Sequence, residues 1–298
     1  MTDYLMRSLL FVPGSSSELM RSAARRNADV LLLDCEDSVQ PNSNKELARQ
    51  NIVEFAQEFG DEKVLFPRIN DRESGELLKD LSMLMVPGID GFMYPKSKTP
   101  EDVYFIDMLI ESLEYEKGIK RGSFKLIILI ETTEAVLRID EICKISDRVI
   151  AVAYGNEDFL TDLGGINDYN FRSLFTPRTL IAMAAKAHGL VPIDTVHIKV
   201  HDLDDLERNL ELSRNLGFEG MLALHPKELD IIHRYYTPSL EDYKQAQEIV
   251  DLYEASQKEG VGVAILNGKF IGPPLAAKAQ AILDKFKKVL KNEKRISK

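Results

Sequence analysis

The feature that most constrains the fold is a regular alternation between short apolar runs, rich in β-branched residues, and longer segments with helical periodicity. Apolar runs of this length suit buried strands, and the intervening segments are long enough for helical crossovers. Eight such strands that alternate with helices favour a closed parallel barrel, the (β/α)₈ TIM barrel of the α/β class. The predicted strands are residues 8–12, 30–33, 64–69, 91–94, 125–130, 149–154, 195–200 and 220–224.

An open, doubly wound sheet is the structural alternative. It is less well supported, because no GxGxxG follows the first apolar run and no GxxxxGK[ST] occurs anywhere. A chain of 298 residues is long enough for one barrel and a short addition. We therefore expect a barrel over residues 1–235 and a C-terminal extension over residues 236–298, packed on its own barrel or swapped between barrels.

The extension does not repeat the strand–helix unit. Residues 240–258 have a helical pattern, and a second amphipathic helix is predicted over 275–290. Between them, residues 261–271 are typical of a hairpin, in which Asn267-Gly268 supplies a type I′ turn.

Local signals mark several helix starts in the barrel. Capping-box spacing occurs where Ser15 precedes Glu18 and where Ser43 precedes Glu46. Two further starts are Thr99 before Pro100, and Asp202 before a segment that ends near Gly217.

Charge and composition narrow the classes of partner. The formal net charge is −10, which disfavours nonspecific binding to nucleic acid or to an anionic membrane. No apolar run approaches the roughly 18 residues of a membrane span, and the first residues lack a signal peptide's pattern. The two cysteines, Cys35 and Cys143, form no CxxC, which suits a reducing cytoplasm and predicts no thiolate metal site.

Acids follow two neighbouring predicted strands. Glu131 comes directly after an apolar run, and Glu157 and Asp158 follow the next one. The carboxyl ends of barrel strands meet at one face, so these side chains can converge. Two carboxylates with water and substrate oxygens suit Mg²⁺, and no HExxH or cysteine cluster suggests zinc. The alternative is that these acids cap helices or lie on the rim.

Other strand ends offer further candidates. Arg68 could grip a substrate carboxylate through two parallel hydrogen bonds, or form an ion pair with Glu36 and Asp37. Ser15-Ser16-Ser17 is interpreted as a helix cap rather than a phosphate cradle. His197 and His201 are interpreted as packing at the rim, on one face of a strand. Cys35 is given no nucleophilic role, because acidic neighbours oppose a thiolate.

Six segments resemble motifs of the citrate lyase beta-subunit family, which includes malyl-CoA, citramalyl-CoA and citryl thioester lyases and, more distantly, the HpcH/HpaI aldolases. The segments occur in the family's order along nearly the whole chain. They are RSLLFVPG at 7–14, LDCEDSV at 33–39, PRIN at 67–70, IET at 130–132, GNEDF at 155–159 with LG at 163–164, and GFEG at 217–220 with LHP at 224–226.

This resemblance implies a Mg²⁺-dependent barrel that is usually trimeric or hexameric. Glu131 and Asp158 match the family's metal ligands, and Glu131 also faces the substrate. Arg68 matches the arginine that binds the substrate carboxylate. Glu36 and Asp37 match acids just behind the metal, and they are the candidate catalytic acids. One position departs from the pattern, because Gly272 stands where relatives carry an acid/base Asp on a lid from a neighbouring subunit.

The expected activity is cleavage of a β-hydroxyacyl thioester of the citryl, malyl or citramalyl type to a 2-oxo acid and an acyl thioester, carried on CoA or a carrier protein. With Gly272 in the lid, a metal-bound water or Asp37 is the candidate base. Two alternatives are an aldolase that acts on free 2-oxo or hydroxy acids and a subunit that binds metal and oxo acid without turnover.

Overall fold

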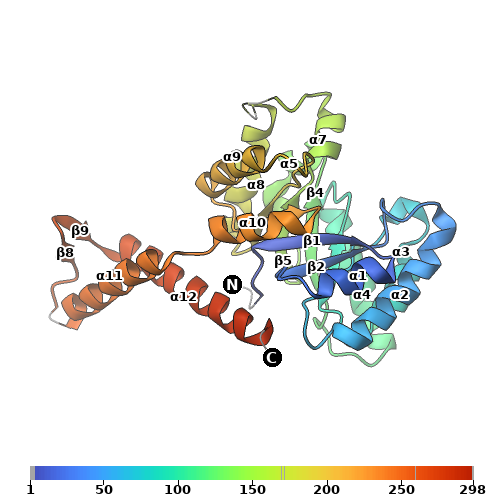
Figure 1. Ribbon diagram of the computed structural model, residues 1–298, viewed down its shortest axis with the longest axis horizontal. Helices are drawn as coiled ribbons and strands as arrows, with labels where there is room; N and C mark the ends of the chain where they lie inside the picture. Colours follow the sequence, from blue (N-terminus) through green and yellow to red (C-terminus); the bar gives the residue numbers. More distant parts are fainter. Residues whose placement is uncertain (1–3, 169, 171, 259, 297–298) are drawn as a thin grey trace. The chain divides into compact units, whose positions relative to one another are not determined.

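The computed structural model describes residues 4–168, 170, 172–258 and 260–296, and the chain divides into two compact units. The first is Met1–His233 and the second is Arg234–Lys298. In the first unit a parallel sheet curves into a nearly closed barrel with helices around it (Figure 1).

The barrel strands lie in the order β2-β1-β7-β6-β5-β4-β3. Residues 64–69 lie between β2 and β3 as an extended segment with isolated bridges, among them Leu31↔Leu65 and Arg68↔Met93. Pro67 has no N–H to donate, which explains why the ladder is incomplete there. This segment closes the ring, and the predicted (β/α)₈ barrel is confirmed. The named strands are β1 (Ser8–Pro13), β2 (Val30–Asp34), β3 (Gly91–Tyr94), β4 (Lys125–Ile130), β5 (Val149–Tyr154), β6 (Val191–Asp194) and β7 (Gly220–Ala223).

One predicted strand was misplaced. The strand expected over residues 195–200 is instead β6, which pairs with β5 through Ala153↔Ile193 and with β7 through Ile193↔Gly220. Pro192 interrupts the apolar run of β6, and a proline within such a run weakens the strand signal. The carbonyl of Pro192 still accepts the N–H of Glu219 at 3.0 Å, so the ladder continues on that side.

The helices cover the outside of the barrel, and two of the four predicted starts are confirmed. Thr99 and Asp102 form a capping box at α4, and Asp202 caps α9, which ends at Gly217. Two predictions were wrong. Ser16 rather than Ser15 caps α1, and a short 3₁₀ turn precedes α2 where Ser43 was expected to cap. The helices are α1 (Ser17–Ala24), α2 (Lys45–Phe59), α3 (Leu77–Leu84), α4 (Pro100–Glu116), α5 (Thr133–Leu137), α6 (Ile139–Lys144), α7 (Asn156–Leu163), α8 (Arg172–Ala187), α9 (Leu203–Leu216) and α10 (Leu229–Tyr236), with 3₁₀ turns at Asn42–Asn44, Arg72–Ser74 and Pro226–Glu228.

The barrel interior is filled by side chains that alternate along the strands. Burial of this apolar surface is the main stabilising contribution, at roughly 25 cal/mol per Å². The cluster includes Leu9, Val30, Leu32, Phe66, Met93, Ile127, Leu129, Ala151, Ala153, Ile193 and Leu222. The interior is therefore a packed core, and the polar residues of the strand ends are left for the carboxyl face.

The second unit has two long helices and a hairpin. Helices α11 (Leu240–Lys258) and α12 (Pro273–Ile296) pack on Ala246, Val250, Ala279 and Leu283. The hairpin joins β8 (Ala264–Leu266) to β9 (Lys269–Ile271). Asn267 and Gly268 both have positive φ, 51° and 75°, as the type I′ turn requires.

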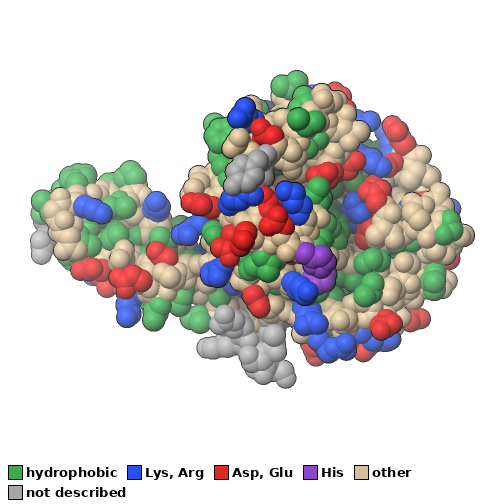
Figure 2. Space-filling model, turned by 45° about the horizontal axis from the view of Figure 1, so that its top comes forward, with side chains coloured by type: hydrophobic (Ala, Val, Ile, Leu, Met, Phe, Trp, Pro, Cys, Tyr) green, Lys and Arg blue, Asp and Glu red, His purple; other side chains and the backbone are tan. Residues whose placement is uncertain are grey.

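On the face in Figure 2, acidic and basic side chains are interspersed over the barrel unit. Hydrophobic side chains gather near the hairpin of the second unit, where Ile265 and Phe270 are 73% and 67% exposed. Among the described residues, none of the helices combines the length and apolarity that crossing a membrane requires.

Candidate active site

A cavity of about 430 Å³ opens at the carboxyl ends of the barrel strands. Its walls include Phe11, Leu129, Val196 and Leu222, together with the polar side chains Asp34, Asp37, Arg68, Glu131, Asn156, Glu157 and Asp158. Four residues singled out from the sequence, Asp37, Arg68, Glu131 and Asp158, therefore lie around one cavity. Glu36 is buried behind them, in contact with Arg68.

Arg68 is anchored by a carboxylate that sequence reasoning did not single out. Its Nε and Nη2 donate to the two oxygens of Asp34, each at 2.7 Å. The remaining Nη1 lies 2.8 Å from Glu36 Oε2 and 3.3 Å from Asp37 Oδ2. The fork of Arg68 therefore grips a carboxylate of the protein, and Nη1 forms the ion pairs with Glu36 and Asp37 that were the alternative interpretation.

Asp34 also shapes the loop that follows β2. Its carboxylate accepts the backbone N–H groups of Glu36 and Ser38, both at 3.0 Å. Burial alone would raise the pKa of Asp34, but the Arg68 guanidinium and these hydrogen bonds lower it below the usual value. Asp34 is the polar end of a fully apolar strand, and that position was the available signal.

A second buried network supports the same loop from below. Lys45 Nζ donates to the carbonyl of Cys35 at 3.1 Å, and it also contacts the side chain of Asn70. Asn70 Nδ2 donates to the same carbonyl at 2.9 Å and to Asp80 at 2.7 Å. Arg49 in turn donates to Asp80 at 2.7 Å. These contacts fix the backbone on which Glu36 and Asp37 stand.

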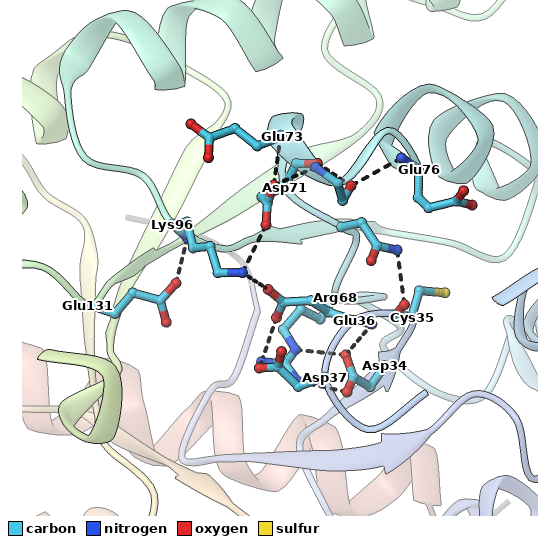
Figure 3. Close-up of polar contacts among 12 residues, drawn as sticks. Asp34, Cys35, Glu36, Asp37, Arg68, Asp71, Glu73, Glu76, Lys96 and Glu131 are labelled. Carbon is cyan, nitrogen blue, oxygen red and sulfur yellow. Dashed lines mark hydrogen bonds and ion pairs between the residues drawn. The ribbon is translucent and has the colours of Figure 1, made fainter. Parts of the chain in front are cut away.

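Glu36 is held between two cations (Figure 3). Besides Arg68, Lys96 Nζ lies 3.2 Å from Glu36 Oε1. Burial raises the pKa of Glu36 to about 7, although both cations oppose the shift. Asp37, whose side chain is 65% exposed, is the acid of this loop that solvent and ligand can reach.

Glu131 is also deeply buried at the cavity, only 3% exposed. Its Oε1 accepts the backbone N–H of Lys96 at 2.6 Å. Burial, and then the neighbouring Glu36 carboxylate, raises the pKa of Glu131 to about 8. Gly155 leaves room beside it, because a Cβ at that position would stand 3.0 Å from Glu131 Oε2.

Asp158 and Glu157 lie in the first turn of α7 and are exposed at the cavity. Their position at the start of α7 therefore also agrees with the alternative interpretation, in which these acids are charges at a helix terminus. Asn156 Nδ2 donates to Glu157 Oε1 at 3.0 Å, and the backbone N–H of Asn156 donates to Thr195 Oγ1 at 3.2 Å. These contacts fix the start of α7 next to Glu131.

The other residues considered in the sequence analysis make contacts that stabilise the fold. Ser16 accepts the N–H of Leu19, as a helix cap does. His197 is buried against Asp205 at 3.2 Å, but residues 195–200 form no strand, so the expected strand face with His201 was wrong. Cys35 is fully buried, and burial raises the pKa of its thiol well above the usual value.

The cavity fits a hard divalent cation. Among the described residues no group of three or more His, Cys, Asp or Glu side chains is arranged to hold a metal, so an ion here would use two carboxylates and oxygens from water or substrate. Gly155 keeps side-chain atoms away from Glu131 Oε2, since a Cβ at Gly155 would stand 3.0 Å from this oxygen. Glu36 and Asp158 both raise the pKa of Glu131, and a cation would relieve this crowding of negative charge.

Comparison with known proteins identifies the family of this chain. The profile of HpcH/HpaI aldolase/citrate lyase matches residues 7–226. The chain belongs to this family. Among its relatives is the citrate lyase subunit beta of Haemophilus influenzae, 29% identical over 97% of this chain and 99% of that protein. The L-malyl-CoA/beta-methylmalyl-CoA lyase of Rhodobacter capsulatus is 30% identical over 94% of each chain.

Solved structures share the fold of this HpcH/HpaI family member. Protein CitE from Mycobacterium tuberculosis, in complex with magnesium, acetoacetate and coenzyme A, superposes with a TM-score of 0.75, at 24% identity, over 96% of this chain and 100% of that one. A citrate lyase from Burkholderia xenovorans gives a TM-score of 0.78 at 20% identity, over 94% of this chain and 91% of that one.

Proposed function

We propose that this chain is a Mg²⁺-dependent carbon–carbon lyase that cleaves a β-hydroxyacyl thioester to a 2-oxo acid and an acyl thioester. The observation that carries the proposal is the placement of Glu131 and Asp158 on one cavity with the Arg68 cluster. The names of the relatives support the reaction class, since they include citrate lyase, malyl-CoA lyase and citramalyl-CoA lyase.

Glu131 and Asp158 are the residues that would hold the ion. A bound Mg²⁺ supplies positive charge that polarises the hydroxyl and carboxylate oxygens of the substrate. Acids outnumber the cations Arg68 and Lys96 around the cavity, so an anionic oxo acid is expected to bind well only after Mg²⁺.

Arg68 orients the carboxylate end of the substrate. Its fork is fixed on Asp34, so the substrate would meet its Nη1 edge and its charge. A guanidinium held in this way cannot swing, and such fixed orientation lowers the barrier by placing the scissile bond correctly.

Asp37 is the candidate general base, because it is exposed at the cavity and stands beside Arg68. It would accept the proton of the substrate hydroxyl as the C–O double bond forms. The C–C bond then breaks, and its electron pair forms the enolate of the departing thioester. Return of the proton from Asp37 to that carbon gives the acyl thioester. Buried Glu36 would assist by holding Arg68 and Lys96 in place.

The substrate would be a 2-oxo or β-hydroxy acid carried on CoA or a carrier protein. Residues 236–298 would form an extension that packs on its own barrel or reaches a neighbouring one, in a homotrimer or hexamer. A cytoplasmic location agrees with two buried free cysteines.

The test is calorimetric titration of the native chain with Mg²⁺ in the presence of oxaloacetate or pyruvate. Glu131→Gln and Asp158→Asn should each weaken binding strongly, because each removes a charged oxygen ligand. Glu134→Gln is a matched control, since Glu134 is an exposed acid three residues from Glu131. Native binding in both ligand variants, once they are shown to be folded, would contradict the assignment.

Turnover separates the proposed reaction from its alternatives. Malyl, citramalyl and citryl thioesters should be cleaved faster than the free acids. A chain that acts equally well on free acids would be an aldolase, and binding without turnover on any thioester would indicate a non-catalytic subunit.

A further inference from the structure

Lys96 has a backbone conformation that residues with a side chain seldom adopt. It lies in the loop after β3 with φ of 51°. Among the described residues the other non-glycine with positive φ is Asn267, in a hairpin turn that favours asparagine. Lysine has no such local preference, since the left-handed region is unfavourable for a residue with a Cβ. Contacts elsewhere must hold Lys96 in this conformation.

The side chain of Lys96 supplies those contacts (Figure 3). Its Nζ donates to Asp71 Oδ2 at 2.9 Å and lies 3.2 Å from Glu36 Oε1. Asp71 is itself fixed, because it accepts the N–H groups of Glu73 and Ser74 at 2.7 and 2.9 Å. The ammonium therefore ties the loop after β3 to the loops that follow β2 and residues 64–69.

The backbone of Lys96 makes the second contact. In the left-handed conformation its N–H points at Glu131 Oε1, 2.6 Å away on the neighbouring strand end. That hydrogen bond occupies one oxygen of Glu131. The other oxygen, Oε2, lies beside Gly155, where a Cβ would stand 3.0 Å from it. The two oxygens of Glu131 thus have different surroundings, and Lys96 determines which one is held.

We propose that Lys96 is a positioning residue for Glu131. The ammonium of Lys96 keeps its backbone in the left-handed conformation, and the backbone N–H fixes Oε1 of Glu131. The other oxygen, Oε2, is then free to bind a ligand in the cavity. This inference rests on the proposed function, in which Glu131 binds Mg²⁺. Lys96 is not among the residues that form the walls of the cavity, so it acts through Glu131 rather than on the substrate.

Two substitutions separate the ammonium from the backbone. Lys96→Met removes the charge but keeps a Cβ, so the left-handed conformation loses its support. Lys96→Gly also removes the charge, but glycine adopts that conformation readily and can still present its N–H to Glu131. The proposal therefore predicts that the two variants differ, although both lack the ammonium.

The measurement is the Kd for Mg²⁺ alone, by calorimetry on the full chain. Lys96→Met should raise the Kd about tenfold, since the left-handed conformation is then unsupported. Lys96→Gly should raise it by less than about threefold. Lys98→Met, which removes an exposed lysine of the same loop, should leave it unchanged. If the methionine variant is poorly folded, Lys96→Ala makes the same comparison.

Three outcomes would overturn the inference. One is a native Kd for Mg²⁺ in Lys96→Met, even with a lower urea midpoint, because Lys96 would then be only structural. Another is an equal loss in Lys96→Met and Lys96→Gly, which would assign the effect to charge. Failure of the native chain to bind Mg²⁺ would overturn the proposed function as well, whereas the first two leave it standing.

Discussion

Arg68 grips Asp34 through two parallel hydrogen bonds, from Nε to Oδ1 and from Nη2 to Oδ2, and each is 2.7 Å long. The side chains are 12% and 1% exposed, so the pair is nearly removed from water. The planar fork of the guanidinium is thus used inside the protein, and Nη1 is left for Glu36, Asp37 and the cavity.

Arg68→Lys should therefore affect both stability and binding. An ammonium keeps the charge but cannot pair with both oxygens of buried Asp34, so we expect a loss of about 1–3 kcal/mol in the free energy of unfolding. The apparent KM for the acid should rise several-fold, because the remaining cation is no longer fixed. Urea unfolding and steady-state kinetics test the two effects. A variant with native stability and kinetics would show that the paired fork contributes to neither.

Gly155→Ala tests the space beside Glu131. The φ of Gly155 is −101°, which alanine accepts, so the effect is steric and not conformational. The added Cβ would stand 3.0 Å from both Cβ and Oε2 of Glu131. We expect weaker Mg²⁺ binding by calorimetry, with urea unfolding changed by about 1 kcal/mol or less. Gly165→Ala, where a Cβ would meet Leu163, is the control. Equal Mg²⁺ affinity in Gly155→Ala and the native chain would mean that this space is not the metal site.

Gly272→Asp tests the missing lid acid. The φ of Gly272 is not positive, and its carbonyl accepts the N–H of Ala276 at 3.1 Å, so it has the N-cap position of α12. Asp is favourable there, and the nearest neighbour of a new Cβ is the ring of exposed Phe270. The variant should therefore be as stable as the native chain.

The native chain should be slow on malyl-CoA and citramalyl-CoA, because Asp37 would act there without the lid acid, and a further positioned acid/base contributes roughly 10²–10⁴-fold. Gly272→Asp should raise kcat if the hairpin reaches the cavity of a neighbouring barrel. Gly272→Asn is the matched control, since it caps the helix but carries no acid. Fast native turnover that Gly272→Asp leaves unchanged would show that Asp37 supplies the proton transfer without a lid acid.

Buried His233 should make the folded protein less stable in acid. Its Nε2 lies 2.7 Å from Ser8 Oγ, which also accepts the N–H of Asp29. The Ser8 hydroxyl is thus placed to donate to a neutral imidazole. Burial lowers the pKa of His233 to about 4, from 6.5, although Asp29 opposes the shift. The unfolded chain therefore binds a proton between pH 6.5 and 4 that the folded chain does not.

The free energy of unfolding should fall as pH drops through this window, with at most about 3 kcal/mol due to His233. Urea unfolding at pH 7 and pH 4.5 measures it. In His233→Gln the fall should be smaller by about 1–3 kcal/mol, because glutamine does not titrate. The control is His201→Gln, at an exposed histidine. Its free energy of unfolding should fall by as much as that of the native chain. Equal slopes in all three proteins would contradict the assignment to His233.

Much of the candidate site could be predicted from the residues at the ends of the strands. The site residues that could not be predicted have physical reasons for it. Arg68, Glu131 and Asp158 each follow an apolar run, so their convergence was predictable from barrel geometry. The importance of Asp34 was overlooked because a last strand residue can point inward or outward. Lys96 could not be singled out, because a left-handed φ of lysine leaves no mark in the sequence.

The sequence by itself determined the barrel, its order of strands and helices, and the acids that can reach the carboxyl face. Apolar periodicity decides these features, because it specifies which surface each element must bury. Only the tertiary structure decided that Arg68 pairs with Asp34 and that Lys96 holds Glu131. Such pairings depend on distances of a few ångströms between residues that are 34 or 35 positions apart in the chain. Packing of the whole barrel fixes those distances, and no local pattern encodes them.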